Sequence, residues 1–311
     1  MRRTLGRAIA DFLVHIRMER SFSRNTATAY RRDLRSFTRF LALQGADPEL
    51  LDPEDIGRPD VRAYLVHLAA ERGLKSSSAS RHLACLRSFF RFLAEDERWQ
   101  ISHDPTLGVR HPKTARRVPS VLSVAEVERL LAASEKVSPY PQRDRALIQL
   151  LVQTGCRVGE VARLRLEHLD LDRNTATFLG KGEKDRVVPV TPTTVAQLRR
   201  YLEEERPRLA RNASEASTGP GAAVFLNTRG RPLSAGGVRR LFREIRKHAG
   251  IGKRVTVHTL RYTCLTFLME AGVDLRMLQE LAGHASLHTT QLYTHLAQWR
   301  KTDAVMKHPF A

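Results

Sequence analysis

The sequence predicts a mainly α-helical protein with a small β-hairpin or sheet, in which a helical N-terminal domain precedes a mixed α/β domain. Three observations support this prediction. Apolar residues recur every three or four positions through the first hundred residues, a basic stretch containing prolines then interrupts them, and strand-like alternation is confined to residues 175–190. At 311 residues and 35.2 kDa, the chain is long enough for two compact domains.

Four helices are expected in the first hundred residues. The clearest runs from Thr26 to Leu43, with an apolar stripe on one face, and a second such stripe runs from Ser78 to Ala94. Shorter patterns cover residues 5–18 and 59–72, and the helical unit closes near Trp99.

Basic residues lie largely off these apolar stripes. Any one of them is more simply interpreted as part of a solvated helix face. As a set, in a chain whose formal net charge of +19 favours a polyanionic partner such as nucleic acid, they favour contact with phosphates: Arg31, Arg32, Arg35, Arg87 and Arg91.

Residues 103–121 contain three prolines and a glycine, which exclude a regular helix and favour an extended chain. The stretch is also basic, and Lys113, Arg116 and Arg117 are expected to contact DNA. We therefore predict an N-terminal domain over residues 1–102, a linker over 103–121 and a second domain over 122–311.

The second domain begins with a capping box, in which Ser123 and Glu126 open a helix that continues to residue 133. Another helix covers residues 143–154 and ends at Gly155, where glycine suits a left-handed cap. Residues 175–179 and 186–190 predict a β-hairpin with a basic tip. Further helices are predicted over residues 193–205, 235–249, 260–271, 275–281 and 289–297.

The formal net charge of +19, with a pI near 10.8, favours a polyanionic partner. Residues 1–117 carry 22 Lys plus Arg against 14 Asp plus Glu, and residues 118–311 carry 30 against 19, so both domains are basic. Nucleic acid is the first candidate and an anionic membrane surface the second. No apolar stretch approaches the roughly 20 residues of a membrane span, and three separated cysteines favour neither a disulfide framework nor a structural zinc site. We expect a reduced, intracellular protein.

Five short segments of the second domain carry groups suited to a phosphodiester. They contribute Arg157, Lys181, His258 with Arg261, His284 and Tyr293. Two guanidinium groups can bind the non-bridging oxygens of a phosphoryl transition state. A lysine of lowered pKa can protonate a leaving 5′-oxygen, and a tyrosine in a positive field can act as the nucleophile. Acidic residues do not cluster as a two-metal nuclease requires, so we expect neither a metal ion nor another cofactor.

Each residue also has a structural interpretation. Arg157 is suited to pair with Glu160, and Lys181 to be a solvated turn residue whose role Lys184 takes. His258 and His284 are compatible with helix-terminal and buried hydrogen-bonding positions, and Tyr293 with an ordinary core position. Lys184 is also a candidate for DNA contact.

Together these motifs resemble the tyrosine site-specific recombinases of the phage integrase family, most closely the Xer-type branch. The resemblance rests on T-G-x-R-x-x-E, the G-K-G-x-K-x-R-x-V-P hairpin, H-x-L-R, and the G-H-x-S-x-x-T-T-Q-x-Y-T-H block. It covers nearly the whole chain. It implies a helical, SAM-like core-binding domain, a linker, a catalytic domain, and a C-terminal tail over residues 299–311 that docks on a neighbouring protomer.

The resemblance also implies a role for each catalytic residue. Arg157 and Arg261 bind the scissile phosphate, Lys181 protonates the leaving 5′-oxygen and His258 acts in acid/base catalysis. His284 supports the phosphate, and Tyr293 attacks to give a 3′-phosphotyrosyl link that can be rejoined without ATP.

The implied function is Xer-like recombination between two DNA duplexes, resolving chromosome or plasmid dimers. The implied partners are double-stranded DNA, a homo- or heterotetramer on two sites, and a cell-division DNA translocase, in the cytoplasm and at the nucleoid. Three alternatives remain open: the integrase of a phage or transposon, a type IB topoisomerase, and a DNA-binding protein that has lost catalysis.

Overall fold

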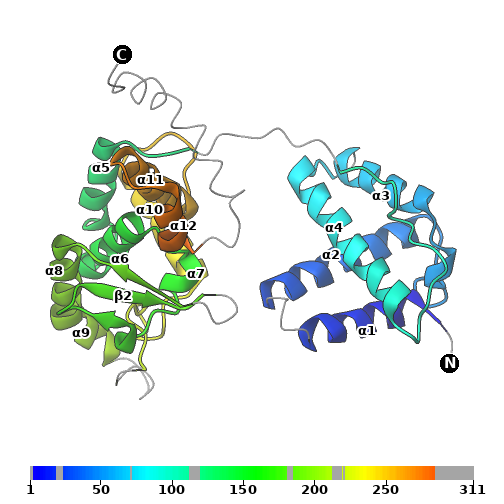
Figure 1. The fold of residues 1–311 in the computed structure, drawn as a ribbon, viewed down its shortest axis with the longest axis horizontal. Coiled ribbons are helices and arrows are strands. Elements are labelled where there is room, and N and C mark those ends of the chain that lie inside the picture. Colours follow the sequence, from blue (N-terminus) through cyan, green and yellow to red (C-terminus); the bar gives the residue numbers. More distant parts are fainter. Residues whose placement is uncertain are drawn as a thin grey trace, which may run out of the picture. The chain divides into compact units, whose positions relative to one another are not determined.

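A computed structural model describes residues 3–18, 24–70, 72–111, 120–180, 185–211, 219 and 221–283. The chain divides into two compact units, residues 1–116 and 117–311, and each is considered by itself (Figure 1). Within the described residues, no helix is both long enough and apolar enough to span a membrane.

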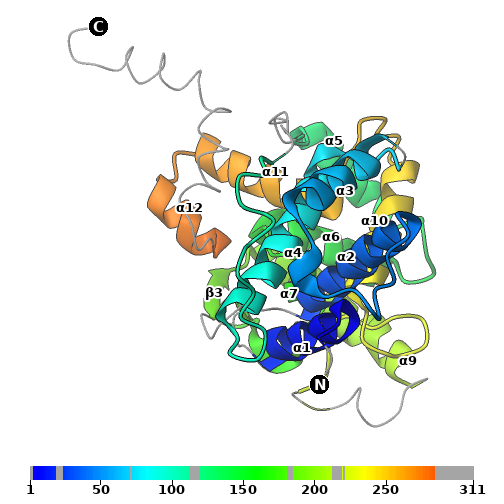
Figure 2. The same cartoon turned by 90° about the vertical axis from the view of Figure 1, so that its right-hand side faces the viewer.

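Unit 1 contains the four predicted helices: α1 (Leu5–Met18), α2 (Arg24–Leu43), α3 (Arg58–Ala70) and α4 (Ser76–Glu95). Figure 2 shows them as blue to cyan ribbons, and α4 contacts the other three. Aromatic side chains fill the space between them. The Phe12 and Phe89 ring centroids lie 5.5 Å apart, and those of Phe37 and Tyr64 lie 5.0 Å apart.

The chain continues to pack against unit 1 after α4 ends. Trp99 and Ile101 are buried in its core, and so is Val109, which falls within the predicted linker. Arg87 on α4 donates to the Val109 carbonyl oxygen at 2.6 Å, which fixes this non-helical segment to the helix.

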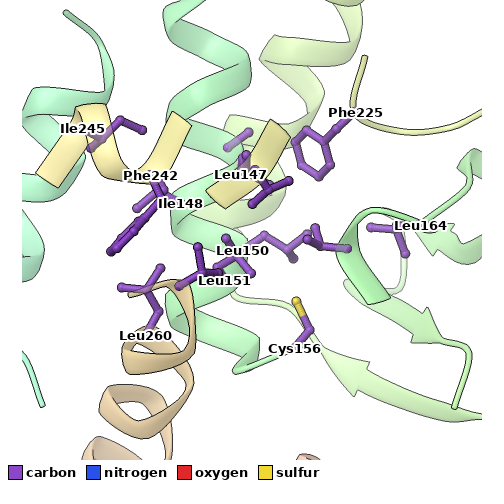
Figure 3. Close-up of a cluster of buried hydrophobic side chains, with 14 of the residues drawn as sticks. Leu147, Ile148, Leu150, Leu151, Cys156, Leu164, Phe225, Phe242, Ile245 and Leu260 are labelled. Carbon is purple, nitrogen blue, oxygen red and sulfur yellow. The ribbon is translucent and has the colours of Figure 1, made fainter. Parts of the chain in front are cut away.

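Unit 2 is built around α6 (Pro141–Thr154), most of whose residues are buried. Figure 3 shows Leu147, Ile148, Leu150 and Leu151 of this helix meeting apolar side chains from several other segments. Its neighbours include α5 (Val124–Ser134) and α11 (Val257–Glu270). The predicted capping box at Ser123 and the left-handed cap at Gly155, with φ of 59°, are both confirmed.

The predicted hairpin is present as β2 (Thr175–Phe178) and β3 (Arg186–Pro189), paired antiparallel with Phe178 opposite Arg186. A short strand that the sequence did not predict, β1 (Leu169–Asp170), adds to the other edge of β2. Ala176, Phe178 and Val188 are buried on the face directed into the core.

The remaining helices follow the sequence with shifted ends. The helix predicted over 193–205 is α8 (Pro192–Arg200) followed by a π-helical turn (Tyr201–Glu205), and α9 (Arg206–Ala210) continues from it. The helices α10 (Ala235–His248), α11 and α12 (Leu275–Ala282) follow. Helix α11 begins earlier than predicted because Thr256 and Thr259 form its capping box. The helix predicted over 289–297 lies outside the described residues.

Candidate active site

Arg157 occupies a sharp turn between α6 and the short helix α7 (Val158–Val161), for which it is the N-cap residue. Gly155 makes the turn with a positive φ, and a Cβ there would lie 3.2 Å from the Cys264 Sγ. The turn therefore requires glycine for two reasons, its backbone conformation and the closeness of α11. The turn brings the Arg157 side chain, which is 42% exposed, to the surface beside the buried C-terminal end of α6.

The Glu160 carboxylate joins two arginines. One oxygen, Oε1, accepts from Nη1 of Arg157 and from Nη1 of Arg186, both at 2.9 Å. The other, Oε2, accepts from the backbone N–H of Arg157 at 2.6 Å and from Nη2 of Arg186 at 2.8 Å. We call Glu160, Arg157 and Arg186 the Glu160 cluster.

The electrostatics of the Glu160 cluster follow from burial, since the Glu160 side chain is only 4% exposed. Burial by itself raises the pKa of Glu160. The hydrogen bonds from Arg186 and from the backbone N–H of Arg157 outweigh that effect, and the pKa falls to about 2. The carboxylate is therefore ionised throughout the neutral pH range.

Arg261 and His258 both lie in the first turns of α11, which begins at Val257, but their exposures differ. Arg261 is 2% exposed, and it donates from Nη1 to the Gly155 carbonyl oxygen at 2.7 Å and from Nη2 to that of Ala282. His258 keeps exposed surface, and its ring lies edge-on to Tyr262 with centroids 4.7 Å apart.

The pKa of His258 is lowered from its ordinary value of 6.5. Partial burial of the ring has the largest effect, and the positive charges of Arg261 and Arg157 add to it. A neutral imidazole at physiological pH is able to accept a proton.

Three consecutive carbonyl groups at the C-terminal end of α12 accept hydrogen bonds from three different arginines. The Leu281 oxygen accepts from Nε of Arg186 at 3.0 Å, the Ala282 oxygen from Arg261, and the Gly283 oxygen from Nη2 of Arg157 at 2.9 Å. Figure 2 shows this end of α12 next to β3. Carbonyl groups in the last helical turn lack intrahelical partners, and cations are favourable there.

The structure thus brings together three of the six predicted catalytic residues, Arg157, His258 and Arg261. Gly155 lies two residues before Arg157, and its carbonyl oxygen accepts from Arg261. Both arginines also donate to carbonyl oxygens at the end of α12. The other three, Lys181, His284 and Tyr293, lie outside the described residues.

The predicted DNA contacts are partly described. Arg32, Arg35 and Arg91 are exposed, whereas Arg31 and Arg87 are half-buried. Arg87 is already engaged by the Val109 carbonyl oxygen and by the His111 ring, which is 2.6 Å from its Nη1. The remaining candidates lie outside the described residues: Lys113, Arg116, Arg117 and Lys184.

Sequence reasoning missed three features of this site. It treated Glu160 only as a structural partner, and it gave Arg186 no role. It also gave no role to the exposed basic face of α10, a helix that it did predict; this face carries Arg239, Arg240, Arg243 and Lys247. The i, i+3 spacing of Arg157 and Glu160 was a signal in the sequence for the role of Glu160. The cluster of basic residues on one helix face was a signal for the role of α10. Among the described residues, no group of three or more His, Cys, Asp or Glu side chains is placed to hold a metal ion.

Comparison with known families identifies both units. Residues 120–300 match the model of the phage integrase family, and residues 9–97 match that of the phage integrase N-terminal SAM-like domain. The chain belongs to the phage integrase family. Within that family it is an Xer-type tyrosine recombinase, an enzyme that cleaves and rejoins DNA.

The relatives match over nearly their whole length. Tyrosine recombinase XerD of Listeria monocytogenes serotype 4b is 39% identical over 304 residues, covering 97% of this chain and 99% of the relative. Tyrosine recombinase XerC of Bacillus pumilus is 35% identical over 302 residues, covering 97% and 96%.

Solved structures share the fold. The Tn1549 transposon integrase in complex with transposon right end DNA has a TM-score of 0.74 at 18% identity, covering 99% of this chain and all of that one. The XerH recombinase in its post-cleavage complex with a difH substrate has a TM-score of 0.72 at 23% identity, covering 93% and 81%.

Proposed function

We propose that this recombinase exchanges strands between two DNA duplexes at a specific site, through a 3′-phosphotyrosyl intermediate formed by Tyr293, and that it resolves chromosome or plasmid dimers. One observation carries the chemical part of the proposal. Arg157 and Arg261, far apart in the sequence, hold the carbonyl groups of residues 283 and 282, directly before His284.

Arg157 and Arg261 are proposed to bind the scissile phosphate. Described residues use two of the five N–H donors of Arg157, through Nη1 and Nη2, and its side chain is 42% exposed. Planar guanidinium groups match the oxygens that gain charge as the phosphorus becomes five-coordinate. Arg261 is proposed to bind the phosphate from the buried side of the site, where its Nη1 and Nη2 donate to the carbonyl oxygens of Gly155 and Ala282 in this structure.

The proposed reaction balances without a cofactor. The Tyr293 oxygen attacks phosphorus, the bond between phosphorus and the 5′-oxygen breaks, and Lys181 gives that oxygen a proton. His258, held neutral by its surroundings, accepts the phenolic proton or passes it on. Attack by the 5′-hydroxyl of another strand reverses these steps and releases the tyrosine.

DNA affinity is proposed to come from exposed basic residues in both units. Unit 1 presents Arg32, Arg35 and Arg91, and unit 2 presents the basic face of α10, a helix that contacts α7. Each phosphate contact of this kind releases counterions, which makes binding strongly dependent on salt.

The assembly is proposed to be a tetramer on two DNA sites, formed by this chain alone or with a second recombinase. The relatives named XerD and XerC support an Xer-like role, and a solved lambda integrase tetramer bound to a Holliday junction shares the fold. We further propose that a cell-division DNA translocase activates it and that it works at the nucleoid in the cytoplasm. We also propose that the DNA-binding domain comprises residues 1–102, the linker residues 103–121 and the catalytic domain residues 122–311.

A suicide substrate tests the chemistry. The bound DNA site is first recovered by crosslinking in cells and is then prepared as a duplex nicked beside the cleavage position. We expect a covalent protein–DNA adduct that is lost in Tyr293→Phe but retained in Tyr262→Phe. Failure of the wild-type protein to form an adduct on a site that it binds would overturn the proposed enzymatic function.

Two further results separate the alternatives. Joining of strands from two different duplexes distinguishes a recombinase from a topoisomerase, which acts on a single duplex. A single chromosomal site near the replication terminus is expected for dimer resolution, whereas sites at the ends of mobile elements would assign the chain to integration instead.

A further inference from the structure

Every donor nitrogen of Arg186 is used within unit 2. Nη1 and Nη2 bind the two oxygens of Glu160 at 2.9 and 2.8 Å, and Nε binds the Leu281 carbonyl oxygen at 3.0 Å. Its guanidinium carbon lies 5.3 Å from the centre of the Phe178 ring, within the range of a cation–π contact. The side chain is 11% exposed, against 42% for Arg157.

These contacts join three segments that are distant in the sequence. Arg186 itself belongs to β3, Glu160 to α7, and Leu281 to the end of α12. Lys181 comes five residues before Arg186 in the sequence, α7 follows Arg157, and α12 ends just before His284. The Arg186 side chain therefore connects three segments, each of which is adjacent in the sequence to a proposed catalytic residue.

Gly283 shows how closely this support is fitted. Its φ is +60°, and a Cβ there would lie 3.1 Å from Nη1 and 3.3 Å from Cδ of Arg186. The backbone before His284 thus rests directly on the Arg186 side chain, and the same Gly283 carbonyl oxygen accepts from Arg157.

We infer that Arg186 is a positioning residue for DNA cleavage: it holds the Arg157 turn, the hairpin and the end of α12 in the arrangement that the reaction requires, without itself binding phosphate. The inference rests on the proposed function. It assigns to Arg186 a role distinct from that of Arg157, because the Arg186 side chain is 11% exposed and each of its three nitrogens donates to a protein group, whereas Arg157 is 42% exposed and two of its nitrogens do so.

Two substitutions separate geometry from charge. Arg186→Met keeps an unbranched apolar stem and removes all the donors of the side chain, whereas Arg186→Lys keeps the charge but replaces a planar fork by a single ammonium group. The control is Arg206→Met, since Arg206 on α9 is also buried and donates to the carbonyl oxygens of Ala223 and Val224, outside the Glu160 cluster.

The measurements are the single-turnover rate of adduct formation on the suicide substrate at saturating protein, the Kd for the same DNA, and the thermal midpoint. A misplacement of about 1 Å costs on the order of 100-fold in rate. We therefore expect Arg186→Met to lower the rate by about that factor with Kd changed less than about threefold, and Arg186→Lys to remain at least about tenfold slow. Arg206→Met is expected to lower the midpoint but to cleave at the wild-type rate below it.

A combination with Glu160→Gln provides the second readout. Because Arg186 acts largely through Glu160, adding Arg186→Met to Glu160→Gln is expected to cost less than about tenfold further, well below the product of the single effects. The inference is overturned if folded Arg186→Met cleaves within about threefold of wild type, if Arg186→Lys restores the full rate, or if the two substitutions multiply. If wild type forms no adduct, it is the proposed function that fails, whereas normal cleavage by Arg186→Met overturns this inference alone.

Discussion

Each unit of the molecule contains a buried carboxylate that pairs with arginine, Asp33 in unit 1 and Glu160 in unit 2, and the two are used differently. Asp33 on α2 is 3% exposed, pairs with Arg81, and lies with Oδ1 3.4 Å from Nε2 of His82. The other ring nitrogen of His82 lies 2.9 Å from the Tyr64 hydroxyl. This network, which we call the Asp33 cluster, connects α2, α3 and α4.

The two clusters differ in their charge balance. In the Asp33 cluster one carboxylate faces one arginine, and burial lowers the pKa of His82, which keeps its ring neutral. In unit 2 the Glu160 carboxylate is shared by Arg157 and Arg186, with Arg261 close behind the same turn. The first arrangement is neutral and packs helices, while the second keeps an excess of positive charge that suits a phosphate.

The largest effect is expected for Glu160→Gln. The amide removes the negative charge and puts a donor where an arginine already donates, so Arg157 loses its fixed position. Single-turnover cleavage of the suicide substrate should fall on the order of 100-fold, while DNA affinity changes little. Cleavage at the wild-type rate by folded Glu160→Gln would show that the Glu160 cluster, like the Asp33 cluster, serves packing alone.

Asp33→Asn is the matched substitution in unit 1. Arg81 is 45% exposed and remains hydrated without its partner, so the cost is that of one buried charge-assisted network. We expect a loss of about 2 kcal/mol in the free energy of unfolding, measured by denaturant titration. Cleavage by the folded protein should be unchanged, and a cleavage defect comparable to that of Glu160→Gln would contradict the distinction between the clusters.

A pH series sharpens the comparison because each unit has a histidine of lowered pKa. Folded His82 resists protonation, whereas unfolded His82 takes a proton near 6.5, so stability is present above that pH and is lost as pH falls below it. The thermal midpoint of unit 1 should therefore decline below about pH 6.5, and His82→Gln should flatten the decline.

His258 also has a lowered pKa, and its effect is expected in the cleavage rate instead of in the stability. Its neutral form is the active one in the proposed reaction, so the acid limb of the cleavage rate should lie below pH 6.5. A limb above that value would mean that the positive charges around His258 do not control its protonation.

The parts of this structure that the sequence predicted depend on residues that are close together in the sequence. The apolar stripe of α2, the capping box at Ser123, the cap at Gly155 and the strand alternation of β2 each involve residues within a few positions of one another. The order of motifs along the chain also predicted Arg157, His258 and Arg261 as candidate site residues, and the structure brings these three together.

What the sequence left unpredicted depends on tertiary contacts. Glu160 and Arg186 are 26 residues apart, Arg157 and Gly283 are 126 apart, and neither separation has a period that a pattern can reveal. The Asp33 cluster was missed for the same reason, because Asp33 and Arg81 come from different helices. The basic face of α10 could be recognised from the local sequence. Basic residues on the exposed face of an amphipathic helix are common, however, and most of them only contact solvent.

The smallest effects are expected from single charges on the outer surfaces of the two units. Arg35→Gln on α2 and Arg243→Gln on α10 each remove one exposed guanidinium group. If each contacts a phosphate, each should weaken binding only a few-fold and reduce the slope of log K against log salt by about 1. Fluorescence anisotropy over a range of salt concentrations measures both. A change of slope for only one of them would restrict phosphate contact to that unit, whereas equal changes would mean that both units bind the DNA backbone.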